Sequence, residues 1–61
     1  MSGKYVLKKG TSGKFHFNLV AGNGEVIATS QTYERKESAR AGIKSVQTNA
    51  GTDTIEDETE D

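Results

Sequence analysis

His16 is the side chain in this 61-residue sequence that is best suited to acid–base chemistry, and the sequence has no second histidine. A catalytic histidine needs a nucleophile or an acid within hydrogen-bond reach. The sequence has no cysteine, and none of its serines or threonines stands in the context of a nucleophile elbow. A histidine at the surface or at an interface is the better interpretation. We therefore expect no catalytic residue, no cofactor and no enzymatic activity, and the role of His16 stays open.

Two glycine-rich stretches and an acidic C-terminal tail could bind a ligand. Residues 10–13 and 22–24 could hold phosphate, but phosphate loops precede helices, whereas these two stretches separate β-prone segments. Residues 51–61 hold six acidic residues and no basic one, without the spacing and central glycine of an EF-hand loop. Since one histidine without cysteine does not make a metal site, we predict no bound metal.

Four lysines and no acidic residue lie in residues 1–24, so a basic body precedes the acidic tail. β-Sheet modules that bind single-stranded nucleic acid place basic residues beside exposed aromatic rings. The residues that could make such contacts are Lys4, Lys8, Lys9, Lys14 and His16. We do not favour this alternative, because the strand alternation directs Phe15 and Phe17 into the core. The acidic tail would also compete for the basic surface.

Length and composition allow one small domain. Below roughly 70–80 residues a single core supplies only about 3–5 kcal/mol, so small folds usually add disulfides, a metal or self-association. Without cysteine, self-association is the remaining means. The first twenty residues contain no continuous apolar stretch, and no segment approaches the ~20 apolar residues of a membrane span. We therefore expect a soluble cytoplasmic protein.

Three strands are predicted, at residues 4–9, 14–20 and 25–30. Thr11-Ser12-Gly13 suits a three-residue hairpin loop, with Gly13 left-handed in a G1 bulge. Asn23-Gly24 predicts a two-residue type I′ turn, which pairs Ala21 with Val26, Leu19 with Ala28 and Phe17 with Ser30.

A helix is predicted from about Lys36, since apolar residues recur at Ala39, Ile43, Val46 and Ala50. Thr32 is a candidate N-cap, although the helix start stays open, and Gly51 could end the helix in a left-handed conformation. Gly42 is explained by close approach of the helix to the sheet. The opposite helix face carries Lys36, Arg40, Lys44 and Gln47. The predicted core consists of Tyr5, Leu7, Phe15, Phe17, Leu19, Val26, Ala28, Ala39, Ile43 and Val46.

The order of these residues resembles the YegP-like family of small bacterial proteins of unknown function. The resemblance runs from Gly13 to Ala50, through the stretches GKFHFNL and NGEVIATS, then Tyr33, GIKSV and Asn49-Ala50. It implies a β-β-β-α-β unit used in pairs, with one continuous sheet and exchanged C-terminal strands. Because this chain holds one unit, the resemblance implies a homodimer. The chain departs from the family pattern at Glu34-Arg35 and in its acidic last segment.

These expectations combine into one prediction for the whole chain. Residues 1–51 form an α+β domain in which one helix covers an antiparallel meander, and residues 52–61 form an acidic tail that could add a short strand at 54–58. The favoured function is a small dimeric structural or interaction module. Nucleic-acid binding through the basic strand face is the alternative, and an unknown protein partner stays open.

Overall fold

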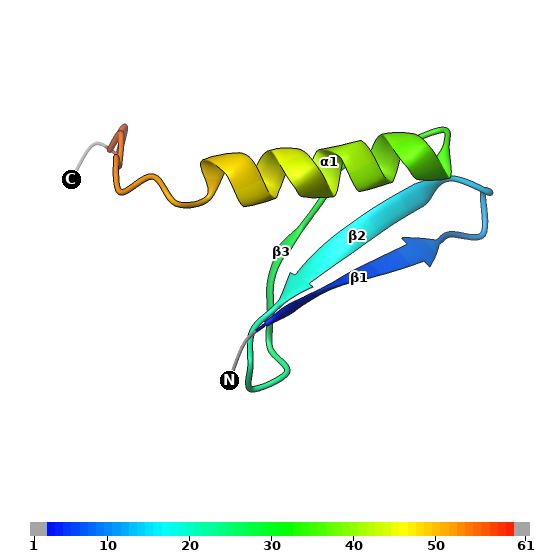
Figure 1. Ribbon diagram of the computed structural model, residues 1–61, viewed down its shortest axis with the longest axis horizontal. Coiled ribbons are helices and arrows are strands. Elements are labelled where there is room, and N and C mark those ends of the chain that lie inside the picture. The colour runs from blue at the N-terminus through cyan, green and yellow to red at the C-terminus, as the bar shows by residue number, and fades with distance from the viewer. Residues whose placement is uncertain (1–2, 60–61) are drawn as a thin grey trace.

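Three strands followed by one helix make up the computed structural model, which describes residues 3–59. The strands are β1 (Lys4–Lys9), β2 (Phe15–Val20) and β3 (Val26–Thr29), and the helix is α1 (Lys36–Asn49). The sheet is antiparallel in the order β1-β2-β3, and α1 lies across one of its faces (Figure 1). The predicted α+β class, with a three-stranded meander under one helix, is confirmed.

The hairpin between β1 and β2 has the predicted three-residue loop. The Gly10 N–H donates to the Lys14 carbonyl (2.8 Å), and the Gly13 N–H donates to the Gly10 carbonyl (3.0 Å). Gly13 has φ 86°, a left-handed conformation that costs a glycine little. This loop pairs Leu7 with Phe17, so both side chains lie on the face below α1.

The hairpin between β2 and β3 differs from the prediction. It repeats the first loop, because Ala21 N–H donates to Glu25 O (2.7 Å) and Gly24 N–H donates to Ala21 O (2.9 Å). Gly24 has φ 91°, whereas no residue other than glycine has a positive φ in the described chain. The Asn23 side chain instead accepts the Glu25 N–H (3.0 Å), as in an Asx turn. The two-residue type I′ turn is therefore wrong.

A β-bulge corrects the register that this longer loop would shift. Val20 pairs with Val26 and Leu19 pairs with Ala28, so Ile27 is an extra residue on β3. The predicted Leu19–Ala28 pair is thereby kept, while the predicted Ala21–Val26 pair is wrong. The Ser30 N–H donates to the Phe17 carbonyl (2.9 Å), so the chain follows β2 beyond the end of β3.

The core is narrower than predicted, because α1 packs mainly on β2. Phe17, Val20 and Ala39 are buried, with 5%, 7% and 0% of their surfaces exposed. Six other residues of the predicted core are half-buried, namely Tyr5, Leu7, Phe15, Leu19, Ile43 and Val46. Val26 and Ala28 are exposed, so their assignment to the core is wrong for this chain alone. Val20 lies at the bulge, and a Cβ added at Gly3 would meet its carbonyl oxygen.

Tyr33 joins the sheet to the helix. Its N–H and carbonyl exchange hydrogen bonds with Phe15 (2.7 and 2.8 Å), and its ring stacks on Phe17 with centroids 6.3 Å apart. A Cβ at Gly42 would lie 2.9 Å from Tyr33 Cζ, closer than real contacts of this kind, and 3.2 Å from Phe17 Cε2, which is unusually tight. The close approach predicted for Gly42 is thus confirmed, and the group that requires it is the Tyr33 ring.

Both ends of α1 differ from the expected caps. Arg35 is the N-cap and makes no side-chain capping bond, so the candidate cap Thr32 is wrong. At the other end Ala50 is the C-cap in a right-handed conformation, and Gly51 has no positive φ, so the glycine cap is wrong too. Residues 52–59 follow without helix or strand. Within residues 3–59, no helix is long and apolar enough to cross a membrane.

Candidate interaction surfaces

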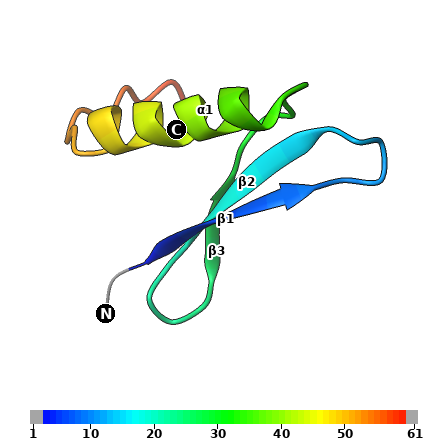
Figure 2. The ribbon, with the colours of Figure 1, turned by 45° about the vertical axis from the view of Figure 1, so that its right-hand side comes forward.

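Two grooves flank α1, one on each side. The first lies between α1 and β3 and has a volume of about 290 Å³. Its wall is mainly apolar, and we call it the apolar groove; the side chains that line it include Phe17, Leu19, Ala28, Tyr33 and Val46. The groove is open because β3 is the last strand of the sheet on this side. Figure 2 shows that α1 lies on one side of the sheet.

The strand beside the apolar groove is exposed along its whole length. All four residues of β3 are exposed, including the large apolar side chains of Val26 (53%) and Ile27 (64%). One edge of β3 pairs with β2, and its other edge borders no strand within residues 3–59. Apolar residues on an unpaired edge are the usual template for pairing with another strand.

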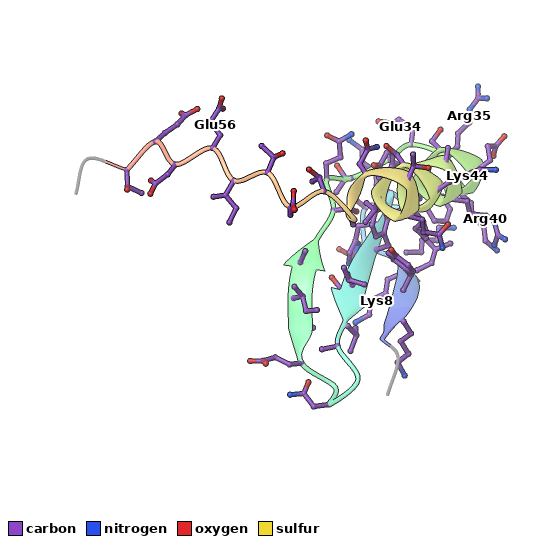
Figure 3. The ribbon with its side chains drawn as sticks, turned by 60° about the vertical axis from the view of Figure 1, so that its left-hand side comes forward. Lys8, Glu34, Arg35, Arg40, Lys44 and Glu56 are labelled. Carbon is purple, nitrogen blue, oxygen red and sulfur yellow. The ribbon has the colours of Figure 1, made fainter. Side chains whose placement is uncertain are left out.

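The C-terminal segment carries a third large exposed apolar side chain, Ile55, with 87% of its surface accessible. This segment leads away from β3 and from the apolar groove of its own chain (Figure 3). Its hydrogen bonds are local: the Thr59 hydroxyl and N–H both donate to the Asp57 carboxylate (2.6 and 2.9 Å). These two bonds lower the pKa of Asp57, since they stabilise its charged form.

The second groove lies between α1 and β1 and is made of two adjoining hollows of about 320 and 330 Å³. Both hollows are lined by Leu7 and Arg40. We call them together the basic groove, because the charged side chains on its α1 side are those of Lys9, Lys36, Arg40 and Lys44. Lys8 also lines the groove, but alternation directs its side chain to the opposite face of the sheet. Its apolar floor includes Tyr5, Leu7 and Ile43.

The structure does not bring the five predicted nucleic-acid contacts into one patch. Lys8 and His16 are cross-strand partners on the face away from α1, and Lys4 shares that face by alternation. Lys9 lies on the helix side, with its Nζ 5.6 Å from the centroid of the Phe15 ring. Lys14 forms an ion pair with Glu34 (3.4 Å).

The helix contributes the cations that the predicted list omits. Lys36, Arg40 and Lys44 recur every four residues, so they lie on one helix face, and Arg40 and Lys44 project on the side of β1 (Figure 3). This periodicity is visible in the sequence, but periodicity alone does not show which strand lies beside that face of the helix. No group of three or more metal-ligating side chains occurs within residues 3–59.

A model of a domain of unknown function, DUF1508, matches residues 11–57. The chain belongs to this family. A UPF0339 protein of Pseudomonas aeruginosa is 53% identical over 53 residues, and UPF0339 protein YegP of Escherichia coli is 41% identical over 56 residues. The resemblance to YegP-like proteins drawn from the sequence is therefore confirmed.

Members of this family differ in length. The matched residues cover 87% of this chain but 48% of the Pseudomonas protein, so the chain spans about half of such relatives. A UPF0339 protein of Treponema denticola is 52% identical over 50 residues, which cover 82% of this chain and 86% of that protein. The solution structure of a protein from Haloferax volcanii superposes with a TM-score of 0.76 at 31% identity, and the match covers 92% of this chain and 97% of that chain.

Proposed function

We propose that this chain is a non-enzymatic interaction module that works as a homodimer, in which the C-terminal segment of each copy completes the sheet of the other. The observation that carries the proposal is the apolar groove beside the exposed strand β3, whose outer edge borders no strand within residues 3–59. An extended segment placed along β3 would satisfy the backbone groups of that edge. It would also cover Val26, Ile27 and the groove wall.

Residues 52–59 of a second copy have the chemistry that this groove requires. Ile55 is the large apolar side chain of the segment, and its neighbours Thr54 and Glu56 would point the other way in a strand. Burying an isoleucine stabilises by about 1.5–3 kcal/mol. The segment leaves its own domain on the β3 side of α1, where it can reach a neighbouring copy (Figure 3).

Family lengths support a unit that is used in pairs. The same unit matches about half of the Pseudomonas and Escherichia proteins but most of the Treponema protein. A longer relative has room for two units in one chain, and a unit on a separate chain would pair with a second copy. A domain this small without disulfides also gains most from association.

The side chains of the two grooves favour binding over catalysis. Neither groove is lined by histidine, aspartate or glutamate, which are the groups that most often transfer protons in enzymes. The proposal therefore assigns binding to these surfaces and no reaction.

Sedimentation equilibrium of three full-length proteins tests the proposal. The wild type should be a dimer, and Ile55→Asp should weaken the dimer at least about tenfold, since a carboxylate cannot replace an apolar side chain in the groove. Thr54→Asp is the matched control, because it adds the same charge on the opposite side of the strand and should leave the dimer intact. A monomeric wild type, or an Ile55→Asp protein that dimerises as tightly, would contradict the exchange.

A further inference from the structure

The basic groove sits on the edge of the sheet that the proposed dimer does not use. β1 pairs with β2 on one side and borders no strand on the other within residues 3–59. The groove runs along this free edge, with an apolar floor and the cationic side chains of Lys9, Lys36, Arg40 and Lys44 around it. Because all of these residues belong to one chain, the surface exists whether or not the C-terminal segment is exchanged.

The positive charge of this groove is not neutralised by neighbouring acids. None of the residues that line either hollow is acidic. The ion pair found among the described residues joins Lys14 and Glu34, neither of which lines the groove. The acidic segment of the same chain lies on the other side of α1, where Figure 3 places Glu56 far from Arg40 and Lys44. The groove therefore offers several exposed cations to an external anion.

The spacing of the helix cations fits an extended chain. Lys36, Arg40 and Lys44 are four residues apart, so each lies about 6 Å further along the axis of α1. Alternate side chains of a β-strand are about 6.6–6.8 Å apart. The two repeats are similar in length, so alternate side chains of a strand added to β1 would face the side of α1 that carries these cations. Its backbone would pair with the free N–H and carbonyl groups of β1.

We propose that the basic groove binds an extended acidic peptide segment of a partner protein as a fourth strand on β1. Alternate glutamate or aspartate side chains of the segment face Lys36, Arg40 and Lys44. The other side chains point away from α1, so they are not selected by it. Lys9 adds to the attraction, and the lysines of β1 repel the β1 edge of a second copy, so two copies do not pair through this edge.

Single-stranded nucleic acid fits the groove less well, although it is also extended and anionic. Such ligands are usually held by bases that stack on open aromatic faces. Phe15 has Lys9 over its ring, and Tyr5 meets Phe17 edge to face with centroids 6.1 Å apart. Both aromatic residues at the groove are therefore engaged within the protein. The free strand edge, in contrast, is specific for a peptide backbone.

Fluorescence anisotropy with the full-length protein tests the inference. The probe is a labelled ten-residue peptide of alternating glutamate and threonine, at low salt, because screening weakens exposed charge pairs. The wild type should bind it, and the same peptide with glutamine in place of glutamate should not bind. Arg40→Glu should weaken binding about fivefold to tenfold, since it replaces an attraction with a repulsion at the centre of the groove.

The matched control is Lys4→Glu, which makes the same change of charge on the face away from α1. It should alter the affinity less than about twofold. Amide shifts in heteronuclear NMR spectra should concentrate on β1 and α1. Absence of binding at low salt, equal losses for Arg40→Glu and Lys4→Glu, or tighter binding of an oligothymidine than of the peptide would overturn the inference. None of these outcomes depends on the Ile55→Asp result, so the two proposals can fail separately.

Discussion

Two adjacent strands of this small sheet, β2 and β3, have opposite surroundings. β2 is the central strand, it lies beneath α1, and each of its residues is buried or half-buried. β3 has the same antiparallel pairing and a comparable share of apolar residues, yet all four of its residues are exposed. One helix is wide enough to cover the middle of the sheet and leaves this edge uncovered. The hydrophobic pattern thus marks a face of a strand, whereas its burial depends on what lies above it.

The contrast implies that the stability of a single chain depends mainly on β2, whereas β3 is the edge at which we propose association. Phe17 is the central core residue of β2. It is buried, its ring meets Tyr5 edge to face, and it stacks on Tyr33. Ile27 is the corresponding residue of β3: it is the extra residue of the bulge, and 64% of its surface is exposed.

The largest expected effect separates these two residues. Phe17→Ala should lower the free energy of unfolding by about 3–5 kcal/mol. That loss is close to the whole stability of a chain this small, so the variant should be largely unfolded. Ile27→Ala should cost less than about 1 kcal/mol in dilute protein, because its side chain already contacts water. Urea denaturation followed by circular dichroism measures both losses in the free energy of unfolding. Equal losses would contradict the proposed difference between β2 and β3.

A second prediction concerns the contact that holds α1 above β2. Gly42→Val places a Cβ against Tyr33 and Phe17 and should cost at least about 2 kcal/mol, through overpacking of the helix–sheet contact. Ala41→Val is the matched control on the exposed side of the helix, where the lower helix propensity of valine costs about 0.5–0.7 kcal/mol. Thermal unfolding distinguishes them. Similar melting temperatures for the two variants would show that α1 does not approach the sheet so closely.

The smallest effect expected is at the loop that leads into β3. Gly24→Ala should cost about 1 kcal/mol or more, because Gly24 has φ 91° and alanine is strained there. Gly22→Ala changes the same loop at a position without positive φ and should change stability by less than about 0.5 kcal/mol. Chemical denaturation of the pair checks the loop assignment. A larger loss at Gly22 than at Gly24 would contradict the three-residue loop.

Local sequence signals account for much of the fold and fail at identifiable points. The loop at Gly13 was predicted correctly, because a glycine after two polar residues suits the common three-residue hairpin loop. Asn23-Gly24 is compatible with two turns. Asparagine can adopt the positive φ of a type I′ turn, or its side chain can accept a backbone N–H in an Asx turn. The bulge at Ile27 decides between them by restoring the Leu19–Ala28 pair. The bulge compensates the register shift of the longer loop. It depends on pairing with β2, so the turn sequence alone does not predict it.

The candidate site, like the fold, could be predicted from the sequence only in part. The periodicity of Lys36, Arg40 and Lys44 was visible in the sequence, as was the exposed lysine edge of β1. Their meeting in one groove depends on how α1 packs on the sheet, where Gly42 lies close to Tyr33 and Phe17. The sequence does not show that arrangement. The five residues proposed from strand charge alone separate onto different faces, because alternation splits Lys8 from Lys9.

Completion of the sheet at β3 by a second copy is the central claim, and isotope-filtered nuclear Overhauser spectroscopy tests it most directly. A mixture of labelled and unlabelled full-length chains reports contacts between copies alone. If the segments are exchanged, the Ile55 methyl groups of one copy should contact Val46 and Ala28 of the other. Ile55 methyl groups that show no intermolecular contact, in a protein that is nevertheless folded, would contradict it.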